Sequence, residues 1–140
     1  MQFKAAILAT LALLSSALAQ SVSVSYDQTY DNASGSLSTV ACSNGPNGLE
    51  TKGFTTFESL PDFPMIGGAP AVAGWNSPAC GTCWELTYEG TSIIVLAVDH
   101  SGDGFNLSLE AMNKLTNGQA TFLGRVTATS RQLTSTQCGL

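Results

Sequence analysis

Residues 77–86 of this 140-residue chain read SPACGTCWEL and place Cys80 and Cys83 three positions apart, with a tryptophan directly after the second cysteine. Such a pair can be a redox dithiol, half of a zinc site, or the meeting point of two structural disulfides. The residues after Cys83 alternate like a strand, whereas redox dithiols usually lie where a strand leads into a helix. Zinc would need a second close pair of ligands, but Cys42 and Cys138 are remote in sequence and the chain has a single histidine. The pattern therefore favours two structural disulfides and no metal site.

The N-terminus predicts export from the cell. Residues 1–19 combine Lys4, a short apolar stretch and a small-x-small cleavage pattern that ends at Ala19, which is typical of a secretory signal peptide. The apolar stretch is too short for a membrane span, and nothing later approaches about 20 consecutive apolar residues. Disulfides form in the oxidising compartments that exported proteins reach. We therefore expect a secreted protein, extracellular or in the cell wall, with a signal peptide over 1–19 and one domain over 20–140.

The composition argues against a nucleic-acid partner. Without Lys4 the chain has four basic residues against ten acidic ones, a net charge of −6, and it contains no basic run. Charged residues are sparse, while Ser, Thr, Gly and Asn are abundant. A surface of neutral hydrogen-bonding groups suits a sugar-rich or cell-wall setting, although it equally suits any secreted β protein. No cofactor is expected.

The pairing of the four cysteines stays open at this stage, because four cysteines allow three pairings. A Cys80–Cys83 bridge would close only a tiny, strained ring. Pairing Cys42 with Cys80 and Cys83 with Cys138 would close loops of about 39 and 56 residues, and the chain-entropy model gives each bridge about 4 kcal/mol. Either way, the framework is a double cross-link of a small domain.

Most of the remaining pattern predicts short strands. Alternating or continuous apolar residues, bounded by turn residues, indicate strands over 21–26, 36–42, 83–88, 93–98 and 125–133. Residues 93–98 are all apolar, so this strand is expected to be buried on both faces. Several short strands with one or two short helices, at this length, predict a small closed or nearly closed β-barrel.

Three segments depart from the strand pattern. Apolar residues at three-residue spacing predict a helix over 109–115, with Asn117-Gly118 as its left-handed stop. Residues 54–60 predict a short helical turn. Residues 66–74 are rich in Gly, Ala and Pro and predict irregular or edge structure.

The stretch from Asp99 to Asn106 carries the most suggestive chemistry, because it follows directly on the strand expected to be most buried. Asp99 and Asn106 offer groups that hydrogen-bond sugar hydroxyls or an N-acetyl group, and glycines such as Gly104 permit close approach of a ligand. Phe105 or a nearby tryptophan would offer an apolar face to a pyranose ring. The alternative is a loop in which Asp99 and Asn106 satisfy backbone donors.

Two catalytic interpretations of this stretch are weaker. Asp99, His100 and Ser101 are adjacent in sequence, which disfavours a catalytic triad because neighbouring side chains on an extended segment point to opposite sides. We expect an exposed His100 instead. A glycosidase would need a second carboxyl group across a cleft from Asp99. The sequence offers four candidates for that group without placing any of them: Asp27, Asp31, Asp103 and Glu85.

The two tryptophans and one glycosylation motif complete the list of candidates. Trp84 is expected in the core by its strand face, and Trp75 belongs either to the core or to the rim of a site. Asn32-Ala33-Ser34 is a candidate glycosylation site in an exposed loop. A second motif begins at Asn106, where a glycan would conflict with ligand contact.

Over nearly all of the expected mature domain, the sequence resembles the cerato-platanin family of small secreted fungal proteins. The matching pieces are VSVSYD, VACSNGPNGL, FPMIGGAPAVAGWNSPACGTCWEL and AVDHSGDGFNLSLEAMNKL, with the last cysteine at Cys138. The resemblance implies a mainly β fold, a six-stranded double-psi β-barrel with one or two short helices. It also implies the disulfides Cys42–Cys80 and Cys83–Cys138.

The resemblance further implies a ligand groove and a function. The family's groove would fall at Asp99, at Gly104-Phe105-Asn106 and at Tyr26-Asp27 on the first strand. Members bind chitin fragments and N-acetylglucosamine oligomers, elicit plant defence, and in some cases self-assemble at surfaces. We therefore expect a secreted, non-catalytic, wall-associated elicitor that binds such oligomers and meets host cell-surface receptors.

An expansin-like, polysaccharide-loosening or weakly hydrolytic protein is the alternative. The His-Phe-Asp motif of expansins is absent, with AVDHSG in the comparable region. A third possibility is a surface-active or host-recognised protein for which ligand binding is incidental.

Overall fold

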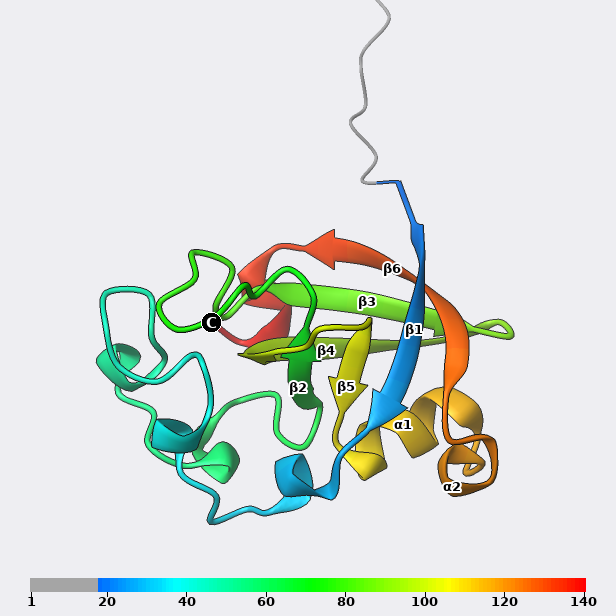
Figure 1. The fold of residues 1–140 in the computed structure, drawn as a ribbon, viewed down its shortest axis with the longest axis horizontal. Coiled ribbons are helices and arrows are strands. Elements are labelled where there is room, and N and C mark those ends of the chain that lie inside the picture. The colour runs from blue at the N-terminus through cyan, green and yellow to red at the C-terminus, as the bar shows by residue number, and fades with distance from the viewer. Residues whose placement is uncertain (1–17) are drawn as a thin grey trace, which may run out of the picture.

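The computed structural model describes residues 18–140, which form a closed six-stranded β-barrel (Figure 1). The strands follow one another around the barrel in the order β1 (Gln20–Tyr26), β5 (Phe105–Leu107), β2 (Ile66–Ala69), β4 (Thr91–His100), β3 (Cys83–Tyr88) and β6 (Val126–Leu133). The pairs β1–β5 and β2–β4 are parallel, and the other neighbours are antiparallel. This is the predicted fold class, and the crossed connections are consistent with a double-psi barrel.

All but the last two residues of the predicted signal peptide, residues 1–19, lie outside the described part of the chain. Within residues 18–140, no helix has the length and apolar character needed to cross a membrane.

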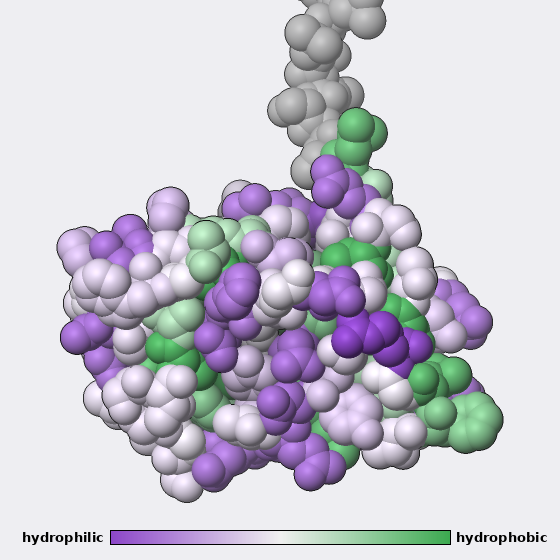
Figure 2. Space-filling model, viewed as in Figure 1, coloured by the Kyte–Doolittle hydropathy of each residue, from purple (hydrophilic) through white to green (hydrophobic). Residues whose placement is uncertain are grey.

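The barrel interior and its outer surface differ sharply in polarity. Apolar side chains from all six strands fill the interior, among them the fully buried Val24, Ile66, Leu86, Leu96 and Leu107. Figure 2 shows an outer face that is mostly hydrophilic or weakly polar, with hydrophobic residues in small separate patches. Burial of the apolar strand faces is therefore the main stabilising contribution, as expected for a domain of this size.

The β3–β4 hairpin pairs strands that are neighbours in the sequence. Its turn residues Glu89 and Gly90 both adopt left-handed conformations, with φ of 45° and 82°, which match the twist of two-residue hairpins. Leu86 on β3 pairs with Ile93 on β4, and both are buried. The predictions of strands over 83–88 and 93–98 are confirmed, and so are those over 21–26 and 125–133.

Two short helices, α1 (Leu109–Thr116) and α2 (Ala120–Leu123), cover one end of the barrel (Figure 1). Ser108 caps α1 by accepting a hydrogen bond from the backbone of Ala111 at 3.0 Å, and Asn117 ends it in a left-handed conformation. Its buried face carries Met112 and Leu115, so the predicted helix and its stop are confirmed.

Residues 27–65 contain no strand of the barrel and wind through four 3₁₀ turns: η1 (Gln28–Asp31), η2 (Leu37–Thr39), η3 (Glu50–Lys52) and η4 (Phe57–Ser59). The turn η4 confirms the helical turn expected over 54–60, and Thr56 and Ser59 form its capping box. A fifth turn, η5 (Ser135–Cys138), follows β6 near the C-terminus.

The predicted strand over 36–42 is wrong. Only Ser36 forms an isolated β-bridge, and the turn η2 follows it. The Ser36 hydroxyl accepts a hydrogen bond from the backbone of Ser38 at 3.1 Å, and the Thr39 hydroxyl donates to the Ser36 carbonyl at 2.6 Å. These short polar side chains satisfy the backbone locally, which competes with a sheet ladder.

The expectation for residues 66–74 is wrong over its first half. Residues Ile66–Ala69 form strand β2, which is paired on both sides, to β4 and to β5, and is fully buried. The glycines reflect close approach of neighbouring backbone, since a Cβ at Gly67 would lie 2.3 Å from the carbonyl oxygen of Asn106. Residues 70–74 are irregular, as predicted.

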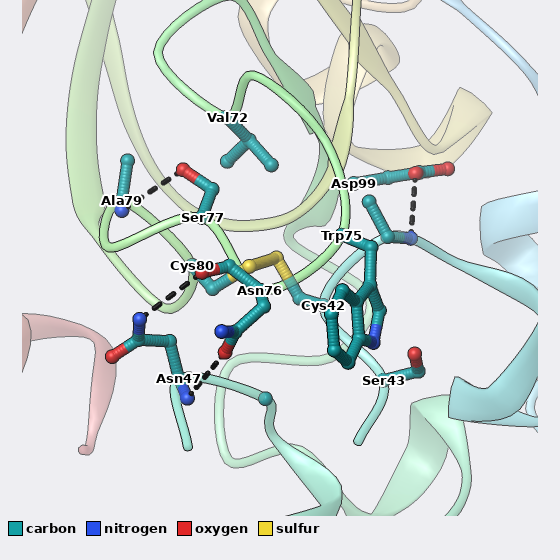
Figure 3. The surroundings of a disulfide bond; sticks show 12 residues. Cys42, Ser43, Asn47, Val72, Trp75, Asn76, Ser77, Ala79, Cys80 and Asp99 are labelled. Carbon is teal, nitrogen blue, oxygen red and sulfur yellow. Dashed lines mark hydrogen bonds between the residues drawn. A yellow bond between two sulfur atoms is a disulfide. The ribbon is translucent and has the colours of Figure 1, made fainter. Parts of the chain in front are cut away.

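Two disulfides tie the loops to the barrel, in the pairing that the family resemblance implies. Cys42–Cys80 joins the segment after η2 to the loop before β3, and Cys83–Cys138 joins the start of β3 to η5. Figure 3 shows the first bridge with Trp75, Asn76 and Asp99 around it. All four cysteines are buried, so the bridges are part of the core as well as cross-links.

Replacing both cysteines of either bridge by alanine should lower the free energy of unfolding by about 2–5 kcal/mol. The reason is that each bridge spans a long loop, with sequence separations of 38 and 55 residues, whose closure restricts the unfolded chain. Urea denaturation followed by circular dichroism measures this loss. Unchanged midpoints in both double variants would contradict a stabilising role.

Asp62, in the turn between η4 and β2, is a carboxyl group that is not fully hydrogen-bonded. Its Oδ2 atom is buried and has no hydrogen-bond partner in the described residues. Burial raises the pKa of Asp62 to about 7, although the nearby Lys114 opposes the shift. Between about pH 4 and pH 7 the folded protein therefore keeps a proton on Asp62 that the unfolded chain has lost.

Because the folded state binds the extra proton, the free energy of unfolding should fall as the pH rises from about 4 to about 8. For this half-buried, partly screened group the fall should be about 1–2 kcal/mol. Asp62→Asn should remove this component and be the more stable form at pH 8. Thermal unfolding across this pH range measures the effect, with Asp103→Asn at an exposed carboxylate as control. Parallel pH profiles for wild type and Asp62→Asn would refute the assignment.

Candidate functional site

A row of polar residues crosses four neighbouring strands at one edge of the barrel. Gly68 on β2 is the register partner of Asp99 on β4 and of Asn106 on β5, and Asn106 in turn pairs with Ser25 on β1. Directly paired residues of adjacent strands project from the same face of a sheet. We call Asp99, Gly68, Asn106 and Ser25 the polar row. Gly68, between Asp99 and Asn106, is buried, and a Cβ there would lie 2.9 Å from the carbonyl oxygen of His100, so the polar side chains of the row come from Asp99, Asn106 and Ser25.

An irregularity in β4 decides that Asp99 belongs to this row. Gly67 pairs with Ala97, but the next residue, Gly68, pairs with Asp99, so Val98 is an extra residue on β4. Such a bulge shifts the side-chain alternation by one position and redirects the residues that follow. Val98 stays fully buried, and Asp99 emerges half-exposed.

The Asp99 carboxylate is held by three hydrogen bonds. Its Oδ2 accepts from the Tyr30 hydroxyl at 2.8 Å, and its Oδ1 accepts from the backbone of Ala41 at 2.9 Å and of His100 at 2.8 Å. Three donors match an ionised carboxylate, which acts only as an acceptor. The structure thus confirms the plainer expectation that Asp99 satisfies backbone donors. Two oxygens offer about four acceptor positions, so capacity for a ligand donor remains.

Tyr30 supports Asp99 and was not found by sequence reasoning. Its ring is buried and packs near Phe57, with ring centroids 6.2 Å apart. Burial raises the pKa of Tyr30 well above its usual value, and the hydrogen bond to Asp99 and the charges of Asp99 and Asp27 raise it further. The hydroxyl therefore stays protonated and keeps donating to the carboxylate. Tyr30 lies in a polar, turn-rich stretch without periodicity, so no signal in the sequence indicated its hydrogen bond to Asp99.

Asn106 is the second polar group of the row. Its Oδ1 accepts a hydrogen bond from the Ser25 hydroxyl at 3.0 Å, and the NH2 group of the same amide is a hydrogen-bond donor. The side chain is half-exposed. Asp99 and Asn106 therefore place an acceptor and a donor on the two strands that pair with Gly68, and their contact with a sugar stays a prediction.

Phe105 is not placed to contact a ligand, which corrects the expectation that its ring faces a sugar. The residue is 2 % exposed, and its ring lies inside the barrel with its centroid 5.6 Å from that of Trp84, in an edge contact. Phe105 and Asn106 alternate along β5, so placing Asn106 on the outer face puts Phe105 inside. Trp84 is half-buried and packs against the core, as predicted.

Gly104 serves close packing against the first strand. It has φ of +68°, and a Cβ at this position would lie 2.0 Å from the carbonyl oxygen of Ser23. Only glycine fits such a contact. Its observed role is therefore to let β5 begin beside β1.

The remaining predicted site residues lie at the end of β1. Tyr26 is half-buried and pairs with Leu107, whereas Asp27 is exposed and caps η1 by accepting a hydrogen bond from the backbone of Thr29 at 2.9 Å. Tyr26 alternates with Ser25 along β1 and packs against the core, so it lies on the face opposite the polar row, which corrects its expected place in the groove. Asn32 is exposed just after η1, where its use as a glycosylation site stays a prediction.

The carboxylates considered as catalytic partners of Asp99 all have structural contacts. Asp27 caps η1, and the Asp31 carboxylate accepts from the backbone of Leu109 at 2.7 Å and of Glu110 at 3.0 Å at the start of α1. Two others take part in ion pairs: Glu85 with Arg131 at 2.8 Å, and Asp103 with Arg125 at 3.5 Å. Each of the four carboxylates therefore has a structural role, and no catalytic function is needed to explain it.

Neither His100 nor a cluster of metal-binding side chains adds a functional group to the polar row. His100 is exposed, as predicted, and its Nδ1 lies 2.6 Å from the carbonyl oxygen of Val72. Across the described residues 18–140, no three His, Cys, Asp or Glu side chains cluster closely enough to hold a metal ion.

A surface hollow of about 550 Å³ lies elsewhere, against the Cys80 side of the loops. Its lining residues are Lys52, Pro78, Cys80, Gly81, Thr82, Gln132, Leu133, Thr134 and Ser135. The lining contains no carboxylate, whereas the polar row has that of Asp99.

The comparison with known proteins agrees with this fold. A sequence profile of the family named Cerato-platanin matches residues 22–140, which is the whole barrel apart from its first residues. The chain belongs to the cerato-platanin family. The allergen Asp f 15 of Aspergillus fumigatus is 54% identical over 117 residues, which cover 84% of this chain and 76% of the allergen.

Solved cerato-platanin structures match as well. The crystal structure of cerato-platanin 2 from M. perniciosa superposes with a TM-score of 0.83 at 48% identity, covering 86% of this chain and 100% of that chain. The solution structure described as the fungal elicitor cerato-platanin has a TM-score of 0.75 at 44% identity, covering 84% and 96%. This chain is therefore a cerato-platanin barrel.

Tyr30→Phe should lower the free energy of unfolding by about 1–2 kcal/mol, because Asp99 loses a donor in a partly buried position. In an Asp99→Asn background the same change should cost clearly less, since the charged acceptor is already gone. A double-mutant cycle by urea denaturation measures the difference. Additive effects of the two changes would show that the contact contributes nothing to stability.

Proposed function

We propose that this cerato-platanin is a secreted, non-catalytic, wall-associated protein that binds chitin or N-acetylglucosamine oligomers and elicits defence in a host. Membership of the family supports the proposal, and so does similarity to a solved protein described as a fungal elicitor. The polar row supports the proposed sugar binding, because the Asp99 carboxylate and the Asn106 amide lie on the two strands that pair with Gly68.

The groups of the row suit a neutral, amide-bearing sugar. The Asp99 carboxylate can accept a hydrogen bond from a sugar hydroxyl, and the NH2 group of Asn106 can donate to the carbonyl oxygen of an N-acetyl group. Three hydrogen bonds already fix Asp99, so binding orders few further side-chain torsions. The acidic excess of the chain disfavours polyanionic ligands.

The same contacts support binding without bond cleavage. A glycosidase needs one carboxyl group kept protonated as a general acid and a second one across the scissile bond. Both oxygens of Asp99 accept hydrogen bonds from the protein, so the group is engaged as an acceptor, whereas a general acid must donate. The candidate partners of Asp99 are engaged as helix caps or in ion pairs.

Replacement of Asn106 by alanine should weaken binding of chitin hexamer about tenfold, because the row loses its amide donor. Isothermal titration calorimetry measures the affinity. The control is Asp103→Asn, an exposed carboxylate in the turn just before Gly104, which should bind as wild type does. Equal binding by wild type and Asn106→Ala would remove the row as the site.

The proposal that the protein does not cleave polysaccharides needs a separate measurement. Incubation with chitin or cellulose should release no reducing ends above a heat-treated control. Release that disappears in Asp99→Asn would instead establish the weakly hydrolytic alternative.

A further inference from the structure

Trp75 is an aromatic ring held at the surface. It is 62 % exposed, yet its indole Nε1 donates a hydrogen bond to the Asn44 Oδ1 atom at 2.7 Å. The polar edge of the ring is therefore satisfied within the protein. What the ring offers outward is its apolar face, which aromatic binding sites use for flat contacts.

The backbone around Trp75 is shaped to keep the ring in this place. Gly45 has φ of +86°, and a Cβ there would lie 3.1 Å from the indole Cζ2 atom. Asn76 is left-handed with φ of 58°, and it accepts hydrogen bonds at 3.0 Å from the backbone and from the side-chain amide of Asn47. The Cys42–Cys80 bridge joins the same two loops (Figure 3). An exposed ring fixed in this way loses little freedom when a ligand binds.

One short segment links this ring to the polar row. The backbone of Ala41 donates to Asp99, and Asn44, three residues later, accepts from Trp75. Three residues span at most about 10 Å, so the two contact points lie close together on the surface. The loop that carries Trp75 is also attached to the end of β4 through His100 and the carbonyl group of Val72.

A saccharide suits this ring better than a protein partner. The exposed large hydrophobic residues in the described part of the chain are Leu18, Trp75 and Phe122. Leu18 lies before β1 and Phe122 lies on α2, so Trp75 is a single exposed ring, and the amides of Asn44 and Asn76 lie beside it. Protein interfaces usually place several such anchors together. A lone apolar face beside hydrogen-bonding amides matches the mixed character of a sugar ring.

We propose that Trp75, with Asn44, forms a second subsite that stacks against a more distant sugar of the N-acetylglucosamine chain whose first residues occupy the polar row. This inference rests on the proposed function. It assigns a length preference to the site, since a short oligomer reaches only the row and a longer one reaches both parts.

Calorimetric titration with chitin dimer and chitin hexamer tests the subsite in three proteins: wild type, Trp75→Ala and Phe122→Ala. Phe122 is a matched control, because it is an 87 % exposed aromatic residue on α2. Trp75→Ala should bind hexamer about five- to tenfold more weakly and bind dimer as wild type does. Phe122→Ala should match wild type with both oligomers.

Fluorescence gives a readout that a merely structural role would not change. The chain has two tryptophans, so Trp84→Phe leaves Trp75 as the only one. In this variant hexamer should shift the emission of Trp75, and dimer should leave it unchanged.

The outcomes separate this inference from the proposed function. Failure of wild type to bind either oligomer would overturn both. Hexamer binding by wild type that Trp75→Ala leaves intact, or an equal loss for dimer and hexamer, would overturn the subsite alone. Loss of the host response in Trp75→Ala with unchanged hexamer binding would also overturn it, and would assign the ring to a protein partner.

Discussion

The Asp99 carboxylate is the contact on which this end of the molecule depends. Its two oxygens join the turn η1 through Tyr30, the segment before Cys42 through Ala41, and its own strand through His100. Residues 27–65 contain no strand of the barrel, so they rely on such contacts and on the Cys42–Cys80 bridge for their position. A half-exposed, ionised carboxylate with three donors is stable because each hydrogen bond offsets part of its lost hydration.

This arrangement connects rigidity with the kind of function the barrel can have. A carboxylate fixed by backbone and phenol donors recognises hydroxyl groups well and is a poor proton donor. The other carboxylates once considered for catalysis are engaged as helix caps or in ion pairs, as Asp31 is at the start of α1. These contacts support the proposed role of the barrel in binding without cleavage. The fixed indole of Trp75 extends the same principle to an apolar contact.

Local patterns predicted much of the fold. The β3–β4 hairpin, α1 with its Asn117 stop, and the strands over 21–26 and 125–133 follow from neighbouring residues, and they are observed as expected. The strand over 36–42 failed because Ser36 and Thr39 bond their own backbone. Strand β2 was missed because its glycines are explained only by the strands on either side of it.

The sequence by itself determined that two disulfides cross-link the domain, that residues 93–98 form an all-apolar strand segment, and that polar residues follow this segment. The tertiary structure alone decided which of those residues face outward. The extra residue at Val98 brings Asp99 into register with Gly68, the pairing of β5 puts Phe105 inside, and the loop contacts hold Trp75 outside. Sequence periodicity fixes alternation along one strand, but the face each residue joins depends on register with strands distant in the chain.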